Sequence, residues 1–378
     1  MVRPGIEVLL SDSLHLISGL RIGLLTNQTG VDRHGVADLD RLLAAGAQVT
    51  AIFAPEHGYR GLLDQAIIDH GLDSSTGIRI WSLYGEVRAP TPEMLEPLDA
   101  VVIDLQDIGA RPYTYISTAL LTMQAAAKHG VRVILLDRPN PIGGVLVQGP
   151  VLDTAFSSFV GMLPVAMRHG MTMGELALMG NRVLGLQADL VVVPAAGWRR
   201  TLWLDQTGLP WVRPSPNMPD LESAAHYPGT VLFEGTNLSV GRGTPVAFQV
   251  VGAPWLSPRE VIARMGTLPG VSVSDTVIVP RAPGDGKYDG VQLPSVRLRV
   301  ADRRIYDPVR AAAALLVAVR EVHRDSLKID AGRFDRLAGG SGLRGAVESG
   351  LGAGEIAALW EQELASFRRL REQFLLYR

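Results

Sequence analysis

The stretch Val49-Thr50-Ala51-Ile52-Phe53-Ala54-Pro55-Glu56-His57-Gly58-Tyr59-Arg60-Gly61 joins an apolar run to a loop rich in charge. Pro55 ends the extended run, because proline lacks a backbone N–H and restricts the residue before it. Gly58 and Gly61 allow backbone angles that other residues avoid. The loop holds a carboxylate, an imidazole and a guanidinium, whereas a plain surface turn uses Asn, Asp, Ser and Gly. This loop is therefore the first candidate for a functional site, and an N-cap with a solvated ion pair is the ordinary alternative.

Apolar runs alternate with helix-like segments on both sides of this stretch. Strands are predicted over residues 21–26, 49–53, 78–82, 100–103, 131–136 and 189–194. Helices are predicted over residues 36–45 and 115–129. Strands that alternate with helices require crossover connections. The sequence therefore predicts an α/β fold with a Rossmann-like, doubly wound parallel sheet, in which ligands bind beyond the carboxyl ends of the strands.

The loops at the two ends of these strands differ in composition. The helix-to-strand loops are plain, as in residues 45–48, whereas the strand-to-helix loops carry side chains that can do chemistry. Those side chains are Asn27, Gln28, Glu56, His57, Arg60, Tyr84, Asp104, Gln106, Asp107, Arg111, Tyr113, Asp137, Arg138 and Asn140. A bare scaffold has no reason to segregate functional groups in this way. The pattern predicts an active site at the carboxyl edge of the sheet.

The length of 378 residues favours two domains. We expect residues 1–205 to form the Rossmann-like catalytic domain. Residues 206–378 are expected to form a smaller mixed α+β domain that completes the cleft, with strands over 247–251, 271–279 and 296–300 and a helix over 309–323. Apolar residues at nearly helical spacing in the tail, 355–377, predict that this domain ends in a long packing helix.

Composition excludes several classes of partner and chemistry. The net charge is −2 and no block of like charge occurs, so binding to nucleic acid or to an anionic membrane is not expected. The chain has no cysteine, which excludes disulfides, thiolate zinc sites and cysteine nucleophiles. No apolar run approaches the ~18 residues of a spanning helix, and the first residues do not resemble a signal peptide. A cytoplasmic location is expected on these grounds.

Motifs for bound cofactors are missing from the sequence. No Gly-x-Gly-x-x-Gly follows the first strand, and neither a Walker A loop nor a Gly-x-Ser-x-Gly elbow occurs. No cofactor is therefore expected. His57 and His169 could bind a metal with Asp104 or Asp107, but no tight spacing of ligands supports this, and no metal is expected either.

The groups that remain suit acid–base chemistry on a polar substrate. A glutamate in a cleft can act as a general acid, and a second carboxylate can act as nucleophile or base, which is the logic of glycoside hydrolysis. Glu56 is the first carboxylate, and the candidates for the second are Asp104, Asp107, Glu175 and Glu234. Thr172 and Glu175 also fit a helix capping box, a structural role for Glu175. Arginines nearby indicate an anionic group on the substrate.

Several stretches together resemble one known family. They are Leu25–Gly30, Phe53–Gly61, Ser82–Gly85, Asp104–Arg111, Tyr113–Tyr115, Asp137–Pro141, Ser158–Gly161, Arg168–Thr172, Pro214–Pro219 and Glu234–Ser239. In these the chain is similar to the NamZ-type exo-β-N-acetylmuramidases, formerly a domain of unknown function. The resemblance implies removal of terminal N-acetylmuramic acid from the non-reducing end of peptidoglycan fragments, in cell-wall turnover or recycling. It also implies that the site lies between a Rossmann-like domain and a smaller one.

The matching motifs imply the site residues. We assign catalysis to Glu56 and its neighbour His57, and also to Glu175, which lies outside these motifs and is one of the candidate second acids. The residues expected to bind substrate are Asn27, Arg60, Tyr84, Asp104, Gln106, Asp107, Arg111, Tyr113, Asn140, Arg168, His169, Glu234 and Asn237. The lactyl carboxylate of muramic acid calls for one of the arginines. Relatives often carry Glu-Gly where this chain has Gln148-Gly149, so an acidic role there is lost.

The expected partner is a muropeptide or muramyl-saccharide substrate, and we allow for a homodimer. Two other functions stay open from the sequence. One is a non-catalytic sugar-binding or regulatory protein, and the other is a metal-dependent hydrolase of another substrate. The clustering of Glu56, His57 and Arg60 in one loop favours catalysis, because a site that only binds a neutral sugar needs amides and aromatic rings more than a clustered acid.

Overall fold

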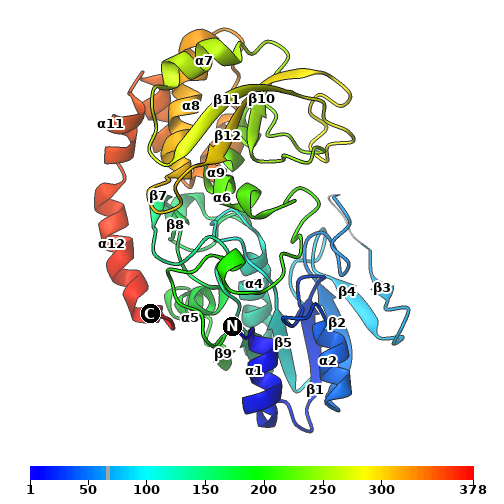
Figure 1. The fold of residues 1–378 in the computed structure, drawn as a ribbon. Helices are drawn as coiled ribbons and strands as arrows, with labels where there is room; N and C mark the ends of the chain where they lie inside the picture. The colour runs from blue at the N-terminus through cyan, green and yellow to red at the C-terminus, as the bar shows by residue number, and fades with distance from the viewer. Residues whose placement is uncertain (65–68) are drawn as a thin grey trace.

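The computed structural model describes residues 1–64 and 69–378 and has a seven-stranded sheet in its first part (Figure 1). The strand order is β3-β4-β2-β1-β5-β6-β9. The strands are β1 (Arg21–Thr26), β2 (Gln48–Ala54), β3 (Gly71–Leu72), β4 (Arg79–Ser82), β5 (Ala100–Asp104), β6 (Arg132–Leu136) and β9 (Leu190–Val193). β3 pairs antiparallel with β4, and the other pairings described in this sheet are parallel. The predicted doubly wound α/β sheet is confirmed.

Helices cover both faces of this sheet. They are α1 (Gly5–Asp12), α2 (Asp38–Ala44), α3 (Pro92–Leu95), α4 (Tyr115–Lys128) and α5 (Met173–Val183), with short 3-10 turns η1 (Leu14–Leu16), η2 (Thr154–Phe156) and η3 (Leu204–Gln206). Ile22 and Leu24 of β1 share a core with residues of α1 and α2. Leu25, on the other face, shares a core with residues of α4 and α5. Alternate residues of β1 thus serve opposite faces, and this two-sided burial explains the continuous apolar runs of the sequence.

The second part of the chain is built around a smaller antiparallel sheet. Its strands β10 (Val250–Gly252), β11 (Val271–Ile278) and β12 (Leu293–Val300) lie in the order β10-β12-β11. The helices of this part are α6 (Leu221–Thr230), η4 (Val231–Gly235), α7 (Pro258–Met265), α8 (Pro308–Val322), α9 (Ala331–Ala338) and α10 (Gly342–Glu348). A short antiparallel pair, β7 (Gln148–Val151) and β8 (Ala166–Arg168), lies between the two sheets in Figure 1. None of the helices in the described ranges has the length and apolar character needed to cross a bilayer.

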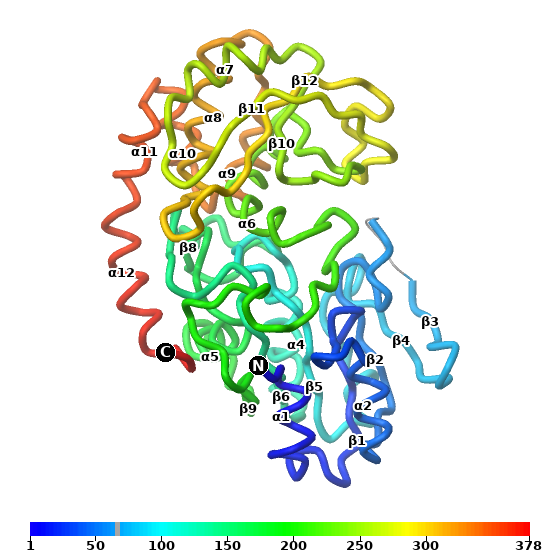
Figure 2. Tube along the Cα trace, viewed as in Figure 1, coloured from blue at the N-terminus to red at the C-terminus, as the bar shows by residue number. Residues whose placement is uncertain are grey.

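The C-terminal tail forms three short helices in place of the single long helix predicted. They are α11 (Ala353–Ala358), α12 (Glu361–Arg371) and η5 (Glu372–Phe374). Figure 2 shows this tail, in red, running from the second part back along the first. Its last residues are fastened there, because Leu376 N–H donates to Glu175 Oε1 at 2.9 Å and the Tyr377 hydroxyl donates to Asp137 Oδ2 at 2.6 Å. The end of the chain therefore packs on the first sheet.

Asp137 is the anchor of this attachment. It follows β6 and is fully buried, and it accepts hydrogen bonds from Thr172 Oγ1 at 2.6 Å and from the Gly174 N–H at 2.8 Å as well as from Tyr377. Burial raises the pKa of Asp137 to about 6, and the hydrogen bonds to Thr172, Tyr377 and Gly174 act in the opposite direction. At neutral pH the carboxyl is ionised, and its ionisation in this buried position lowers the stability of the folded protein.

This raised pKa predicts a pH-dependent stability. Because the folded pKa lies above the ordinary value of 3.8, the protonated group favours folding below about pH 4, and that contribution is lost as the pH rises through about 6. In Asp137→Asn this dependence is absent. We expect the stability of wild type relative to Asp137→Asn to fall by on the order of 3 kcal/mol between pH 4 and pH 7. Urea unfolding of both proteins across this range measures the difference, and a constant difference would contradict the assignment.

Candidate active site

The loop after β2 turns sharply and places Glu56 at the carboxyl edge of the sheet. Gly58 N–H donates to Pro55 O at 3.0 Å, and Gly61 N–H donates to Gly58 O at 3.1 Å. Gly61 has φ +66°, and a Cβ there would lie 1.9 Å from the side-chain amide of Gln28. The close approach to Gln28 and the left-handed φ both favour glycine at this position.

Glu56 is half-buried and is surrounded by hydroxyl groups. Thr114 Oγ1 donates a hydrogen bond to Glu56 Oε2. Burial, then the charge of Glu56 and a hydrogen bond to it, raise the pKa of Tyr84 well above its ordinary value. Phe159 lies beside Tyr84, with ring centroids 6.3 Å apart. The carboxylate thus stands half-buried among hydroxyls and aromatic rings.

His57 has a defined tautomer and a strained backbone. Its φ is +71°, in the left-handed region that side chains rarely adopt. Nδ1 lies 2.7 Å from the carbonyl oxygen of Leu63, and because a carbonyl oxygen only accepts, Nδ1 carries the proton. In the neutral ring Nε2 then keeps its lone pair. The predicted catalytic His57 therefore lies next to Glu56 in the chain, with its ring tied to its own loop.

Three buried tyrosines connect Glu56 to the second part of the chain. The ring centroid of Tyr113 lies 4.9 Å from that of Tyr115 and 5.8 Å from that of Tyr227. Burial, then the charge of Glu234, and with it the charges of Glu56 and Asp107, raise the pKa of Tyr227 well above its ordinary value. One phenol of α6 therefore lies within the field of three carboxylates. Sequence reasoning missed Tyr227, because it lies inside a helix and follows no strand.

Polar contacts join the Glu56 loop to the second part directly. Asn217 Nδ2 donates to Asp64 Oδ2 at 2.7 Å, and Arg242 Nη1 lies 3.7 Å from Asp64 Oδ1. Arg242 Nε also donates to Glu234 Oε1 at 2.6 Å. Asp64, Asn217 and Arg242 were not among the predicted site residues. Asn217 lies in one of the motifs on which the family resemblance rests, Pro214–Pro219, and that motif was the signal that could have found it.

Asp107, in the loop that follows β5, faces His169, which follows β8. Asp107 Oδ2 accepts from Gly109 N–H at 2.6 Å and lies 3.6 Å from His169 Nε2. His169 Nδ1 accepts from the Met171 N–H at 3.1 Å, so in a neutral ring Nε2 carries the proton and points it at Asp107. Asp107 Oδ1 is buried and has no hydrogen-bond partner in residues 1–64 and 69–378. The predicted Gln106 holds this loop through Nε2, which donates to Asp107 O and Pro139 O at 2.8 and 3.0 Å.

The structure uses four of the predicted residues as internal supports. Asn140 bonds Met171 O and the Ile142 N–H, and Asn237 bonds Ser326 O and the Lys328 N–H. Asp104 is fully buried and pairs with Arg138, with Nη2 and Oδ2 2.9 Å apart. Glu175 is the fourth. The hydrogen bonds of these side chains lie within the scaffold.

Glu175 lies at the start of α5, where it completes the predicted capping box with Thr172. Its Oε1 accepts from Arg200 Nη1 at 2.6 Å and from the Leu376 N–H at 2.9 Å. The helix is anchored at the end of β6, three strands from β2 in the sheet, which is ~14 Å at ~4.8 Å per strand. These contacts favour a structural role for Glu175.

The three arginines that were predicted to bind substrate differ in how accessible their guanidinium groups are to a ligand. Arg111 is buried and donates to four carbonyls, those of Pro150, Val165, Leu337 and Ala338, so it ties the first part to α9. Burial lowers its pKa to about 9. Arg168 is also buried and lines a different cavity, described below. Arg60 is 68% exposed and makes a long ion pair with Asp73 at 3.8 Å, so of these three arginines it has the guanidinium most accessible to a ligand.

A hollow of about 430 Å³ lies beside Arg60. Asn27, Gln28, Tyr59 and Asp73 contribute to its wall. Asn27 Oδ1 accepts from Thr29, whereas its Nδ2 is buried with no partner in the described ranges. Within those ranges no group of three or more His, Cys, Asp or Glu side chains is placed to hold a metal ion.

A mostly parallel α/β sheet with a half-buried glutamate at its carboxyl edge, among hydroxyls, aromatic rings and an exposed arginine, is typical of an enzyme that cleaves a polar, sugar-like substrate. Comparison with known proteins agrees. The N-terminal model of the exo-β-N-acetylmuramidase NamZ family matches residues 22–222, and its C-terminal model matches residues 225–377. The chain therefore belongs to the NamZ family of exo-β-N-acetylmuramidases.

Individual relatives support this assignment over the whole length. The peptidoglycan β-N-acetylmuramidase NamZ of Bacillus subtilis is 39% identical over 382 residues, which span 100% of this chain and 91% of the relative. Two crystal structures of DUF1343 family proteins from Bacteroides fragilis are similar in fold. One has a TM-score of 0.91 at 34% identity and the other 0.81 at 32%, and both alignments cover 100% of this chain and 99% of the other.

Proposed function

We propose that this glycoside hydrolase removes terminal N-acetylmuramic acid from the non-reducing end of peptidoglycan fragments, with Glu56 as a catalytic carboxylate. Full-length membership of the NamZ family supports the reaction. The observation that carries the site is the half-buried Glu56 carboxylate, held by Thr114 and Tyr84 beside loops of both parts of the chain.

Cleavage of a glycosidic bond needs a proton for the leaving oxygen and a carboxylate to stabilise an oxocarbenium-like transition state. Hydroxyls from Thr114 and Tyr84 orient the Glu56 carboxyl, and a hydroxyl can either donate to it or accept from it. The carboxyl can therefore be held both with and without its proton. Tyr113, Tyr115 and Tyr227 are buried, and the charge of Glu56 acts on all three phenols.

We infer that Asp107 is the second carboxylate. Of the four candidates, Asp104 and Glu175 are neutralised by buried arginines, and Glu234 is paired with Arg242. Asp107 keeps one oxygen without a partner in the described ranges and faces the Nε2 of His169. Its loop leaves β5, which is separated from β2 by β1 alone.

Glu56→Gln tests the first assignment. The amide keeps the shape of the side chain and removes the proton transfer and the charge, so we expect kcat to fall ~10²–10⁴-fold with little change in stability. Release of N-acetylmuramic acid from a synthetic muramyl glycoside measures the rate, and Glu93→Gln on the surface is the control. Full activity in Glu56→Gln would overturn the role of Glu56. Binding without turnover in wild type would point instead to a sugar-binding protein.

Asp107→Asn and Glu175→Gln separate the second catalytic carboxylate from the structural one. Asp107→Asn should lower kcat by ~10²-fold or more and leave the unfolding midpoint nearly unchanged. Glu175→Gln breaks a buried ion pair and should cost ~3–5 kcal/mol of stability, while the protein that stays folded keeps its kcat. Activity per folded molecule and urea unfolding give both numbers. The opposite pattern would return Glu175 to the catalytic role that the sequence predicted.

Arg60 is our candidate for recognition of the lactyl carboxylate. Arg60→Met should raise KM about tenfold for a muramyl glycoside, because a charge-assisted hydrogen bond is lost, and should change kcat little. The matched glucosaminyl glycoside lacks the lactyl group, so its slow turnover should not respond. Arg132→Met, at an exposed ion pair with Asp189, is the control. Equal losses on both substrates would exclude Arg60 from this role.

A further inference from the structure

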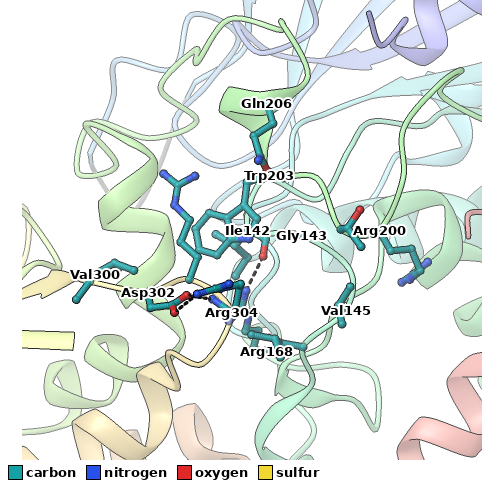
Figure 3. Close-up of a pocket in the computed structure, with 14 residues that line it drawn as sticks. Ile142, Gly143, Val145, Arg168, Arg200, Trp203, Gln206, Val300, Asp302 and Arg304 are labelled. Carbon is teal, nitrogen blue, oxygen red and sulfur yellow. Dashed lines mark hydrogen bonds and ion pairs between the residues drawn. The ribbon is translucent and has the colours of Figure 1, made fainter. Parts of the chain in front are cut away.

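A cavity of about 750 Å³ lies apart from Glu56, between the first and second parts of the chain (Figure 3). We call it the Trp203 pocket. Its walls come from the loop 142–146, from Arg168 of β8, from the segment 200–206 and from the turn 300–304 after β12. Its volume lies within the ~300–1,000 Å³ usual for small-molecule sites. None of the residues that line it belongs to the group around Glu56.

Four arginines line the pocket, and three of them have a carboxylate partner. Arg200 pairs with Glu175 at 2.6 Å, Arg303 with Asp205 at 2.8 Å and Arg304 with Asp302 at 2.7 Å. The fourth is Arg168. Four guanidiniums therefore face three carboxylates, which leaves one positive charge in the wall of the pocket.

Arg168 carries this uncompensated charge. Its side chain is 1% exposed, and no carboxylate within residues 1–64 and 69–378 lies within 4.0 Å of its guanidinium nitrogens. The guanidinium donates to Gln148 Oε1 at 3.0 Å and to Ile142 O at 2.5 Å, both neutral, and its Nε has no partner in those ranges. The charge of Asp307 acts on it, but Asp307 Oδ1 caps α8 through the N–H groups of Val309 and Arg310. A buried cation without a counter-ion is costly, and an anion in the pocket would offset that cost.

The mouth of the pocket offers groups that can contact such an anion. The side chains of Arg303 and Arg304 are 41% and 87% exposed, and exposed ion pairs of this kind are worth little. Both guanidiniums can therefore turn from their own acids to a ligand at small cost. Arg371 adds a further cation behind the wall, where its Nη1 donates to Gly144 O at 3.2 Å.

The rest of the wall is flat and apolar. Trp203 stands between two guanidiniums, with Arg303 4.5 Å and Arg168 5.5 Å from its ring centroid. Figure 3 shows Trp203 with Ile142, Gly143 and Val145 around the same space. Aromatic and aliphatic surface beside guanidiniums suits a ligand that carries an acid on a ring or short apolar body.

We propose that the Trp203 pocket is a second binding site, distinct from the active site, for a small organic carboxylate with a flat or apolar body. The ligand's acid lies against Arg303 and Arg304 in the field of Arg168, and its body packs on Trp203. A ligand here contacts both parts of the chain and braces them against each other. This proposal does not depend on the proposed reaction, because ligand binding to the pocket can be measured without substrate turnover.

The first test is calorimetric titration of the full chain with benzoate, with neutral benzamide as the matched probe. Benzoate should bind, and benzamide should bind at least tenfold more weakly because it lacks the charge. Benzoate should also raise the unfolding temperature in proportion to its occupancy. Equal affinity for the two probes, or no binding of benzoate at 10 mM or below, would overturn the proposal.

Two variants locate the binding without removing Arg168. Gln148→Glu places a carboxylate where the neutral Gln148 now meets Arg168, so it should weaken benzoate about tenfold while the pocket stays open. Val145 is 55% exposed on the pocket wall, so Val145→Trp fills the space from the solvent side and should abolish binding. Val183→Trp, an exposed position at the end of α5, is the control. Benzoate affinity unchanged in both Gln148→Glu and Val145→Trp would place the ligand elsewhere and overturn the assignment.

Competition identifies the source of the natural carboxylate. A muramyl peptide that displaces benzoate from Glu56→Gln protein would assign the pocket to the peptide carboxylate of a wall fragment. Displacement by free small acids alone would assign it to a separate metabolite. Either result supports a carboxylate site. Failure of the muramidase assay leaves these binding results unaffected, so the two proposals can fail separately.

Discussion

Parallel pairing of β1 with β2 on one side and β5 on the other is the constraint on which the site depends. Leu25 lies opposite Phe53, and Thr26 lies opposite Asp104, so all three strands end at the same level. The loops that follow therefore begin side by side and bring Asn27, Glu56 and Asp107 to one edge. Close packing enforces this arrangement, because a Cβ on Gly23 would lie 2.6 Å from the ring of Phe53.

Buried charge holds these loops in place beneath the site. Arg138 forms an ion pair with Asp104, and its charge also acts on Asp38; burial raises the pKa of both carboxyls. Thr26 Oγ1 donates to Asp38 Oδ2 at 2.5 Å, and Arg138 Nη2 also donates to Val31 O at 2.7 Å. The network ties the ends of β1, β5 and β6 together. The carboxyl edge therefore holds more charged residues than the reaction needs. Some of these residues hold the loops in place, and the loops carry the remaining ones.

The second part of the chain completes the surroundings of Glu56. Tyr227 packs against Tyr113, Asn217 and Arg242 hold Asp64 of the Glu56 loop, and Arg111 ties the first part to α9. The environment of the carboxylate thus depends on how the two parts dock. The Trp203 pocket lies at another point of the same contact, so a ligand bound there would act on a boundary that the site also uses.

The sequence by itself determined the sheet and its helices, and it pointed to the edge at which we propose the site. Two-sided burial produces continuous apolar runs and parallel strands require crossover helices, and both leave a local pattern that can be recognised without a structure. The family motifs likewise placed Glu56, Asp107 and their neighbours at that edge. The capping box of Thr172 and Glu175 could also be predicted, because its two residues are three positions apart in the sequence.

Only the tertiary structure showed which charged residues have buried partners and which do not. Asp104, Glu175 and Arg111 read as site residues in the sequence, yet their partners Arg138, Arg200 and the carbonyls of α9 lie 25 or more positions away. Tyr227 and the Trp203 pocket arise from contacts between distant segments, and the tail breaks into short helices where it crosses back to the first part. The physical reason is that ion pairing and burial depend on which distant segments come into contact, and a local sequence pattern does not contain that information.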